Sequence, residues 1–234
     1  MRLFAPYNLI QIAGVTCLEE ALMLIDKGVR YIGFPLKLQD GREDLSEEEA
    51  RFIISTIKPK SQPFLITYQK RAKEISEICE YLGVDIVQLH GQIELSEVQN
   101  LKKLSPNLQI IKSLIIKGDN LKELERDINL FSQFTDFFVT DTYDPQTGRT
   151  GATGKIHSWD ISAEAVRLSP VPVILAGGLT PENVREAIVK VKPAGVDSHT
   201  GVEDSNGRKD SKPIKKFVSE AQKGFNDLLN EHQN

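Results

Sequence analysis

A short apolar run, followed by two glycines and a helix start, is the stretch of this chain best suited to bind an anion. Val173–Leu175 is typical of a strand buried on both faces. Gly177 and Gly178 follow, where backbone N–H groups can approach a ligand with no Cβ in the way. Thr180 is a favourable N-cap and Pro181 suits the first helical position, so the positive end of a helix dipole is expected beside the glycines. The stretch predicts a phosphate cradle, although Gly-Gly is also an ordinary tight turn.

A second polar, glycine-containing loop lies downstream. The predicted strand Gly195–Asp197 leads into it, and His199, Thr200 and Gly201 stand where the strand has ended. Barrels of eight strand–helix units commonly bind phosphate with the loops after strands seven and eight. We therefore expect both glycine loops to contact a phosphate group, with His199 either contacting the anion or simply packing.

Titratable and amide side chains occur where two other predicted strands end. Asp141 follows the apolar run Phe137–Thr140, while Gln88 and His90 lie at the end of Asp85–Leu89. In a parallel barrel these ends meet at one face, where catalytic side chains are found. An aspartate here can instead form a turn, and a histidine can simply hydrogen-bond inside the barrel mouth. For Asp141 the acid–base role is favoured over the turn.

Strand and helix patterns alternate along the whole chain. Apolar runs predict strands at Leu9–Ile12, Tyr31–Phe34, Phe64–Thr67, Asp85–Leu89, Leu108–Ile111, Phe137–Thr140, Val173–Leu175 and Gly195–Asp197. Capping boxes at Thr16–Glu19 and Ser46–Glu49 begin two of the helices, and Asp210 is expected to cap the last one. Eight alternations with short connections in 234 residues predict an α/β protein, a single (β/α)₈ TIM barrel over residues 1–234.

Composition and charge argue against several functional classes. The chain is 40% apolar and 26% charged with a net charge of −4, which gives no electrostatic footprint for nucleic acid or anionic membrane. No apolar run approaches the length of a membrane span. Two cysteines are too few for a disulfide framework, and no group of His, Cys and carboxylates has metal-ligand spacing. We expect a cytoplasmic protein that binds no metal, nucleic acid or membrane.

Taken together, the order and spacing of these motifs resemble the phosphoribosylanthranilate isomerases of tryptophan biosynthesis. The resemblance covers nearly the whole chain, and the segments that carry it are Val87–Gly91, Asp141, Thr150–Lys155, Ile174–Asn183 and Gly195–Glu203. It implies an aldose–ketose isomerase that needs no cofactor. The implied reaction is the Amadori rearrangement of N-(5′-phosphoribosyl)anthranilate to 1-(carboxyphenylamino)-1-deoxyribulose 5-phosphate.

The resemblance also implies roles for particular residues at the substrate end. Asp141 matches the general acid, Gly154 joins the phosphate-binding glycines, and Gln88 and His90 line the aromatic end of the substrate pocket. Arg42 lies close to the position of an arginine that binds the anthranilate carboxylate, but about one residue out of register.

One departure from the family affects a residue that would transfer a proton. The family has Lys-Ile-Cys-Gly at the end of strand one, with the cysteine as general base, whereas this chain has Ala13 at the cysteine position. Loss of a general base typically costs about 10²–10⁴ in rate. Cys17, expected in the first turn of the next helix, is a candidate surrogate base because the helix dipole lowers a thiol pKa. The alternative, which we favour, is that Cys17 is only a small, half-buried residue in a capped turn. His157 matches none of these motifs and is expected at the surface.

Three hypotheses about function follow. The first is a phosphoribosylanthranilate isomerase, impaired or with an atypical base. The second is an isomerase or lyase for a different phosphorylated sugar, in which Asp141 acts with His199 or another strand-end group. The third is a sugar-phosphate-binding protein without catalysis. In each case the expected ligand is a small phosphorylated sugar, and the chain is a monomer or a homodimer.

Overall fold

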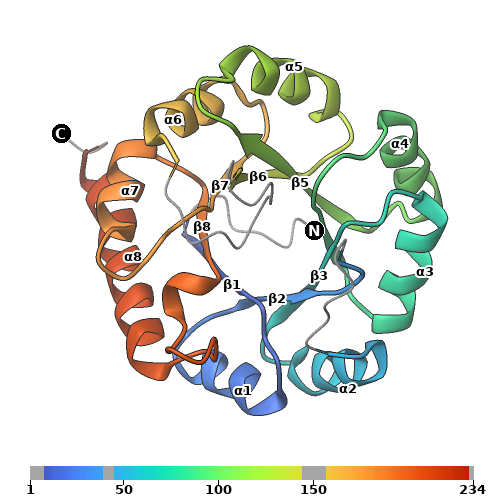
Figure 1. The fold of residues 1–234 in the computed structure, drawn as a ribbon, viewed down its shortest axis with the longest axis horizontal. Coiled ribbons are helices and arrows are strands. Elements are labelled where there is room, and N and C mark those ends of the chain that lie inside the picture. The colour runs from blue at the N-terminus through green and yellow to red at the C-terminus, as the bar shows by residue number, and fades with distance from the viewer. Residues whose placement is uncertain (1–7, 39–44, 144–156, 232–234) are drawn as a thin grey trace.

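The computed structural model describes residues 8–38, 45–143 and 157–231. Within them, eight parallel strands close into a barrel in chain order, and β8 pairs back with β1 (Figure 1). The strands are β1 (Leu9–Ala13), β2 (Tyr31–Pro35), β3 (Gln62–Thr67), β4 (Ile86–Leu89), β5 (Gln109–Ile116), β6 (Phe137–Thr142), β7 (Val173–Leu175) and β8 (Gly195–Ser198). The predicted barrel is confirmed.

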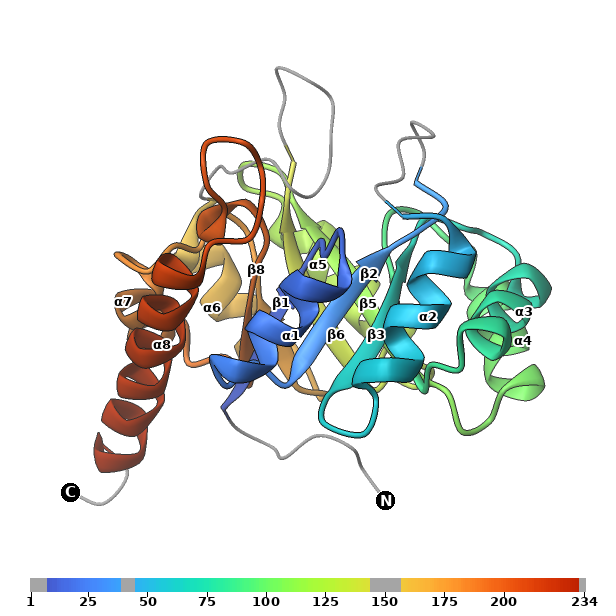
Figure 2. The same cartoon turned by 90° about the horizontal axis from the view of Figure 1, so that it is seen from below.

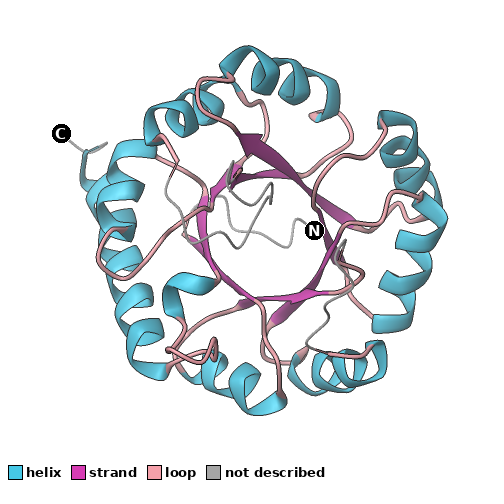
Figure 3. Cartoon of the chain, in the orientation of Figure 1, coloured by secondary structure: helices cyan, strands magenta, loops and turns pink. Residues whose placement is uncertain are grey.

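Helices surround the barrel as an outer ring (Figure 3). They are α1 (Leu18–Asp26), α2 (Glu47–Ile57), α3 (Ala72–Leu82), α4 (Leu95–Leu104), α5 (Leu121–Phe131), α6 (Trp159–Leu168), α7 (Val184–Val191) and α8 (Ser211–Glu231), with a short 3₁₀ helix η1 (Thr200–Val202) after β8. Seen from the side, α1 and α2 lie along the outer face of the strands (Figure 2). Within the described residues no helix is both long and apolar enough to cross a membrane.

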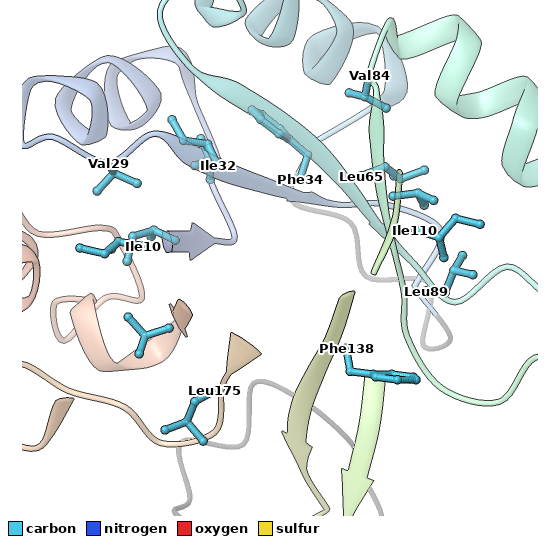
Figure 4. Packing of buried hydrophobic residues seen from close by; sticks show 14 of the residues in the cluster. Ile10, Val29, Ile32, Phe34, Leu65, Val84, Leu89, Ile110, Phe138 and Leu175 are labelled. Carbon is cyan, nitrogen blue, oxygen red and sulfur yellow. The ribbon is translucent and has the colours of Figure 1, made fainter. Parts of the chain in front are cut away.

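Strand residues alternate between two cores. One face of each strand packs against the helices, as Figure 4 shows for Ile32, Phe34, Leu65 and Phe138 among others. The other face fills the barrel interior with a separate apolar cluster: Leu9, Ala13, Tyr31, Phe64, Ile66, Ile86, Ile111, Phe137, Val139, Ile174 and Ala176. The alternation means that every second residue of a strand points into the barrel. Side chains at the carboxyl ends of the strands therefore converge at one mouth.

Two predicted strands, β5 and β6, end more than one residue later than their apolar runs suggested. β5 continues to Ile116 and β6 to Thr142, because the two strands pair over their full extent, with Asp141 opposite Ile115. Asp141 is therefore a strand residue held by sheet hydrogen bonding. A polar residue that ends an apolar run does not end a strand when the neighbouring strand continues to pair with it.

The two predicted capping boxes have different outcomes. Ser46 caps α2, with both reciprocal bonds to Glu49 present, as expected. At α1 the prediction is wrong by one residue, because Cys17 is the N-cap and Glu20, not Glu19, accepts hydrogen bonds from the backbone N and hydroxyl of Thr16. Glu20 is also bound by Arg208 over 2.6 Å, a partner distant in sequence.

The α2 cap supplies a test of local stability. In Ser46→Ala the backbone N–H of Glu49 loses its side-chain acceptor, so the unfolding free energy is expected to fall by about 1 kcal/mol. Ser55→Ala, which removes an exposed hydroxyl bonded to Phe52 O within the same helix, is the matched control and should change stability by less than about 0.5 kcal/mol. Urea unfolding of the two variants measures the difference; equal losses would contradict this role for the cap.

Candidate active site

Asp141 marks the centre of the candidate site. It lies at the carboxyl end of β6 and is 4% exposed. Its Oδ1 accepts a hydrogen bond from the Thr142 backbone N over 2.8 Å. His90, directly after β4, places Nε2 3.2 Å from Asp141 Oδ2, without the alignment of a hydrogen bond. The two side chains that sequence predicted for the mouth are therefore in contact.

Burial keeps a proton on Asp141. Removal from water is the largest cause, and the negative charge of Asp197 adds to it, so that the pKa of Asp141 is raised to about 7. The Thr142 bond and the positive charge of Lys112 oppose this rise without cancelling it. The neighbouring His90 is also buried, and burial followed by the Lys112 charge lowers its pKa to about 4. Near neutral pH the pair is therefore a neutral imidazole beside a carboxyl that can donate a proton.

A polar layer lies beside this pair inside the barrel. Gln11 on β1 donates through Nε2 to Gln88 Oε1 over 3.2 Å, and Gln88 is buried. Asp197 on β8 pairs in register with Gln11, and burial raises the pKa of Asp197 to about 7 despite its hydrogen bond with Gln11. Asp197 Oδ1 and His90 Nδ1 have no hydrogen-bond partner among the described residues. Buried polar atoms are usually satisfied, so these atoms are available to a ligand.

The first loop holds Ala13 and Cys17 in different surroundings. Ala13 is buried in the interior cluster of the barrel, pointing into the mouth. Cys17 is the N-cap of α1 and not a residue of its first turn, contrary to prediction. Its Sγ lies 3.0 Å from Nη2 of Arg208, which also holds Glu20, so the thiol belongs to a contact between α1 and the segment before α8.

The two glycine loops lie next to each other at the ends of β7 and β8. Gly177 and Gly178 have φ of 106° and 64°, which favour glycine. A Cβ on Gly177 would overlap Thr142, and one on Gly201 would overlap the carbonyl of Leu179 in the preceding loop. Thr200, in contrast, is exposed at the start of η1. Because Gly177 and Gly201 have no side chain, the two loops can approach each other closely.

The helix start expected at Pro181 is displaced. α7 begins at Val184, and Asn183 is its N-cap. Thr180 still accepts a hydrogen bond from Glu182 N over 3.2 Å, but it caps a turn that precedes the helix. Asn183 Nδ2 in addition donates to Gly178 O over 3.0 Å, which ties this turn to the glycines.

His199 projects beside the first loop. A Cβ on Gly14 would overlap its ring, and its Nε2 lies 3.4 Å from Glu203 Oε1. Glu203 in turn accepts from Lys209 Nζ over 2.6 Å. Burial, followed by the charges of Lys209 and His90, lowers the pKa of His199 well below its ordinary range. The ring is neutral at neutral pH although 30% of its side-chain surface is exposed.

Sequence reasoning missed or misplaced several residues of this site. His157 is not a surface residue: Nδ1 lies 2.7 Å from Thr142 Oγ1 and Nε2 2.7 Å from Ser162 Oγ, which links β6 to α6. Lys112, held by the carbonyls of Gly91 and Ser113, tunes both members of the Asp141–His90 pair. The only sequence signal for the role of Lys112 is that a lysine stands within an apolar strand run. Arg42 and Gly154 lie outside the described residues. The described part of the chain contains no cluster of side chains suited to a metal ion.

The fold and the site together define a (β/α)₈-barrel protein with acid–base side chains at the carboxyl mouth and glycine loops after β7 and β8. A sequence model described as N-(5′phosphoribosyl)anthranilate (PRA) isomerase matches residues 10–220. The chain therefore belongs to the phosphoribosylanthranilate isomerase family.

Comparisons with individual proteins give the same family. N-(5′-phosphoribosyl)anthranilate isomerase 2 of Methanosarcina mazei is 36% identical over 217 residues, which are 92% of this chain and 95% of that protein. The crystal structure of phosphoribosyl anthranilate isomerase from Thermotoga maritima superposes with a TM-score of 0.78 at 29% identity and covers 92% of this chain and 99% of that one. A phosphoribosyl anthranilate isomerase in complex with reduced 1-(o-carboxyphenylamino)-1-deoxyribulose 5-phosphate gives 0.75 at 27% identity, covering 92% of this chain and 99% of that one.

The raised pKa of Asp141 predicts a pH-dependent gain of stability in Asp141→Asn. The carboxyl has a pKa of about 7 in the folded protein and its ordinary value of 3.8 when unfolded. Between these values the folded protein holds a proton that the unfolded chain has released, so the parent loses stability as pH rises from about 4 to about 7. Asparagine stays neutral, so the variant should be more stable than the parent by about 2–4 kcal/mol at pH 8 and nearly equal to it at pH 4.

Urea unfolding at both pH values measures this effect. Asp119→Asn, at an exposed position before α5, removes a carboxyl without burial and serves as the matched control. If the variant is no more stable than the parent at pH 8, ionisation of Asp141 does not lower the stability of the folded protein, and its pKa is not raised.

Proposed function

We propose that this chain isomerises N-(5′-phosphoribosyl)anthranilate to 1-(o-carboxyphenylamino)-1-deoxyribulose 5-phosphate. The observation that carries the proposal is the buried carboxyl of Asp141, with its raised pKa, at the mouth of a barrel of this family. The chemistry is an intramolecular oxidation and reduction of the sugar, so it balances without a cofactor.

Asp141 is proposed as the acid that opens the sugar ring. A carboxyl whose pKa is about 7 keeps its proton near neutral pH and still releases it readily, which suits a general acid. Protonation of the ring oxygen makes that oxygen a leaving group, and the anthranilate nitrogen supplies the electron pair that replaces the broken bond. His90, neutral and 3.2 Å from the carboxyl, supports this role as a contact to the substrate.

The phosphate is proposed to lie over the two glycine loops. Gly177 and Gly178 adopt conformations that expose their backbone N–H groups, and Gly201 allows the loop after β8 to approach them. The exposed hydroxyl of Thr200 offers a further donor, and His199 lies beside it. A solved relative described as a complex with a reduced deoxyribulose 5-phosphate product supports a phosphorylated sugar as ligand.

The aromatic end of the substrate is proposed to lie nearer the barrel axis. His90 presents an edge there and makes a T-shaped contact with Tyr68, with ring centroids 5.2 Å apart. Gln88 is a weaker candidate because its amide is occupied by Gln11. Arg42 stays a proposal for the anthranilate carboxylate, as does Gly154 for the phosphate.

The setting of the protein follows from this activity. We expect a cytoplasmic enzyme of tryptophan biosynthesis that acts without nucleic acid or membrane partners. A Thermotoga maritima relative is described as a dimeric enzyme from which monomers were generated, and this chain is expected to be either a monomer or a homodimer.

Turnover tests the proposed function. Freshly generated N-(5′-phosphoribosyl)anthranilate is followed by the loss of its anthranilate fluorescence. Asp141→Asn is expected to lower kcat/KM by at least about 10²-fold, because the amide cannot donate a proton to the ring oxygen. For the parent, kcat/KM should fall as pH rises above about 7, where Asp141 ionises. Asp119→Asn controls for the loss of a carboxyl.

The other sequence hypotheses give different results in this assay. Turnover of another phosphorylated sugar, with none of the anthranilate adduct, would support the second hypothesis. Binding of the reduced product analogue without turnover, and with equal affinity in Asp141→Asn, would support the third. Undiminished turnover by Asp141→Asn would remove the carboxyl from the mechanism.

The phosphate site predicts a separate kinetic effect. Thr200→Val keeps the shape of the side chain and removes its hydroxyl, so KM should rise severalfold while kcat changes little, as expected for loss of uniform binding. Thr56→Val, on the exposed face of α2, is the matched control. Inhibition by inorganic phosphate, measured in parallel, should weaken in Thr200→Val alone; equal inhibition of all three proteins would place the phosphate elsewhere.

A further inference from the structure

His199 stands beside the end of β1 at the barrel mouth. It directly follows Ser198, the last residue of β8, which pairs with Ile12 of β1, and it is the N-cap of η1. The ring covers the backbone of Gly14, where a Cβ would overlap three of its atoms. The imidazole therefore lies against the residue that follows Ala13.

The isomerisation needs a proton acceptor as well as a donor, and the inference made here rests on that proposed function. While the acid protonates the ring oxygen, a proton must leave carbon C2′ of the sugar. Ala13 is buried at the mouth and has no lone pair. The acceptor must therefore be another side chain that reaches the same space.

Other titratable groups near the mouth are engaged. Lys112 Nζ donates to two backbone carbonyls, each over 2.9 Å. The Cys17 thiol contacts Arg208 beside α1. Asp197 is buried and its carboxyl is hydrogen-bonded with Gln11. His90 lies against Asp141, on the acid side of the mouth. His199 is a neutral ring whose side chain is 30% exposed.

Two charged residues contact His199, Glu203 at its ring and Lys209 at its backbone carbonyl. Glu203 Oε1 lies 3.4 Å from Nε2 and is fixed by Lys209, whose side chain is 1% exposed. Lys209 Nζ also donates to the carbonyl of His199 over 3.1 Å. A carboxylate beside Nε2 favours the tautomer with the proton on that nitrogen, which leaves the lone pair on Nδ1. This is the arrangement of a base oriented by a third group.

We propose that His199 is the proton acceptor of the isomerisation and that Glu203 is the positioning residue that orients its imidazole. Burial lowers the pKa of the ring, which keeps it unprotonated at neutral pH and makes it a weak base before substrate binds. Its surroundings contain the opposing charges of Glu203 and Lys209, the neutral ring of His90 and, on the preceding strand β8, Asp197. An anionic phosphate on the adjacent loop raises the pKa of the imidazole and strengthens it as a base only when substrate is bound.

The proton transfers balance within the substrate and two side chains. Asp141 protonates the ring oxygen, the bond from C1′ to that oxygen breaks, and the nitrogen lone pair forms the C1′=N bond. His199 removes the C2′ proton; the C–H electron pair forms the C1′=C2′ bond, and the C=N π pair returns to nitrogen. The imidazolium then returns its proton to C1′ while the enol hydroxyl gives its proton to the Asp141 carboxylate. The product is the 2′-ketone, and both side chains regain their starting states.

The test compares His199→Asn, Glu203→Gln and the parent in the turnover assay. His199→Asn is expected to lower kcat by about 10²–10⁴-fold with little change in KM. Glu203→Gln should lower kcat less, by about 10-fold, because it weakens the orientation and keeps the base. With deuterium at C2′, His199→Asn should show a larger isotope effect on kcat than the parent, since proton removal then limits the rate.

A phosphate-binding role for His199 predicts the opposite pattern. KM and the inhibition constant for inorganic phosphate would rise, while kcat would stay within about 3-fold of the parent. That result, or an unchanged kcat with unchanged KM, overturns the inference and leaves the proposed function standing.

Chemical rescue keeps the test decisive if a substitution disturbs the local fold. Added imidazole should restore kcat of His199→Ala by at least 10-fold (about 1.4 kcal/mol in the barrier), and should not rescue Asp141→Asn. Absence of rescue in a His199→Ala protein that melts with the parent overturns the inference. A parent without any turnover overturns both the proposed function and the role of His199.

Discussion

The closed barrel places a carboxyl group where water cannot solvate its charge, and the chemistry of the site depends on that. Asp141 is fixed in β6 by strand pairing and cannot turn out to solvent without loss of sheet hydrogen bonds. Its nearest titratable neighbour, His90, is itself buried and neutral, so no adjacent cation compensates an ionised carboxylate. The more distant charge of Lys112 only partly offsets burial. A protonated acid near neutral pH is the consequence.

The barrel interior is mostly apolar, but it contains one polar layer. Gln11, Gln88 and Asp197 form this layer among the apolar side chains of the interior cluster. A polar layer is less stabilising than an apolar one, because each buried polar atom must find a partner. Among the described residues, Gln11 Oε1 and Asp197 Oδ1 of this layer have no hydrogen-bond partner. A polar layer that lowers the stability of the fold is consistent with the trade-off between stability and activity at functional sites.

The loops that surround the mouth are fastened to one another as well as to their strands. Ser198 Oγ donates to Leu179 O over 2.9 Å, and Gly201 allows the same carbonyl to approach. His157 links Thr142 at the end of β6 to α6. These contacts hold the glycine loops and the acid in one rigid frame, which a positioned acid–base reaction requires.

The sequence by itself determined the barrel and the place of a carboxyl group, that of Asp141, at the end of β6. Alternating strand and helix patterns specify eight units, because burial of an apolar strand between two layers leaves a signal that needs no knowledge of its neighbours. Asp141 and the glycines were found for the same reason: they stand directly after such runs. The Ser46 cap is equally local, since its partner is three residues away.

Only the tertiary structure decided which residues meet across the mouth. Glu20 replaces Glu19 at the start of α1 partly because Arg208, almost the whole chain away, also binds its carboxylate. His157 is held between Thr142 and Ser162 despite a polar sequence context. The position of His199 over Gly14 depends on the pairing of the first and last strands when the barrel closes. No local pattern encodes such contacts, because closure brings together residues whose separation along the chain carries no periodic signal.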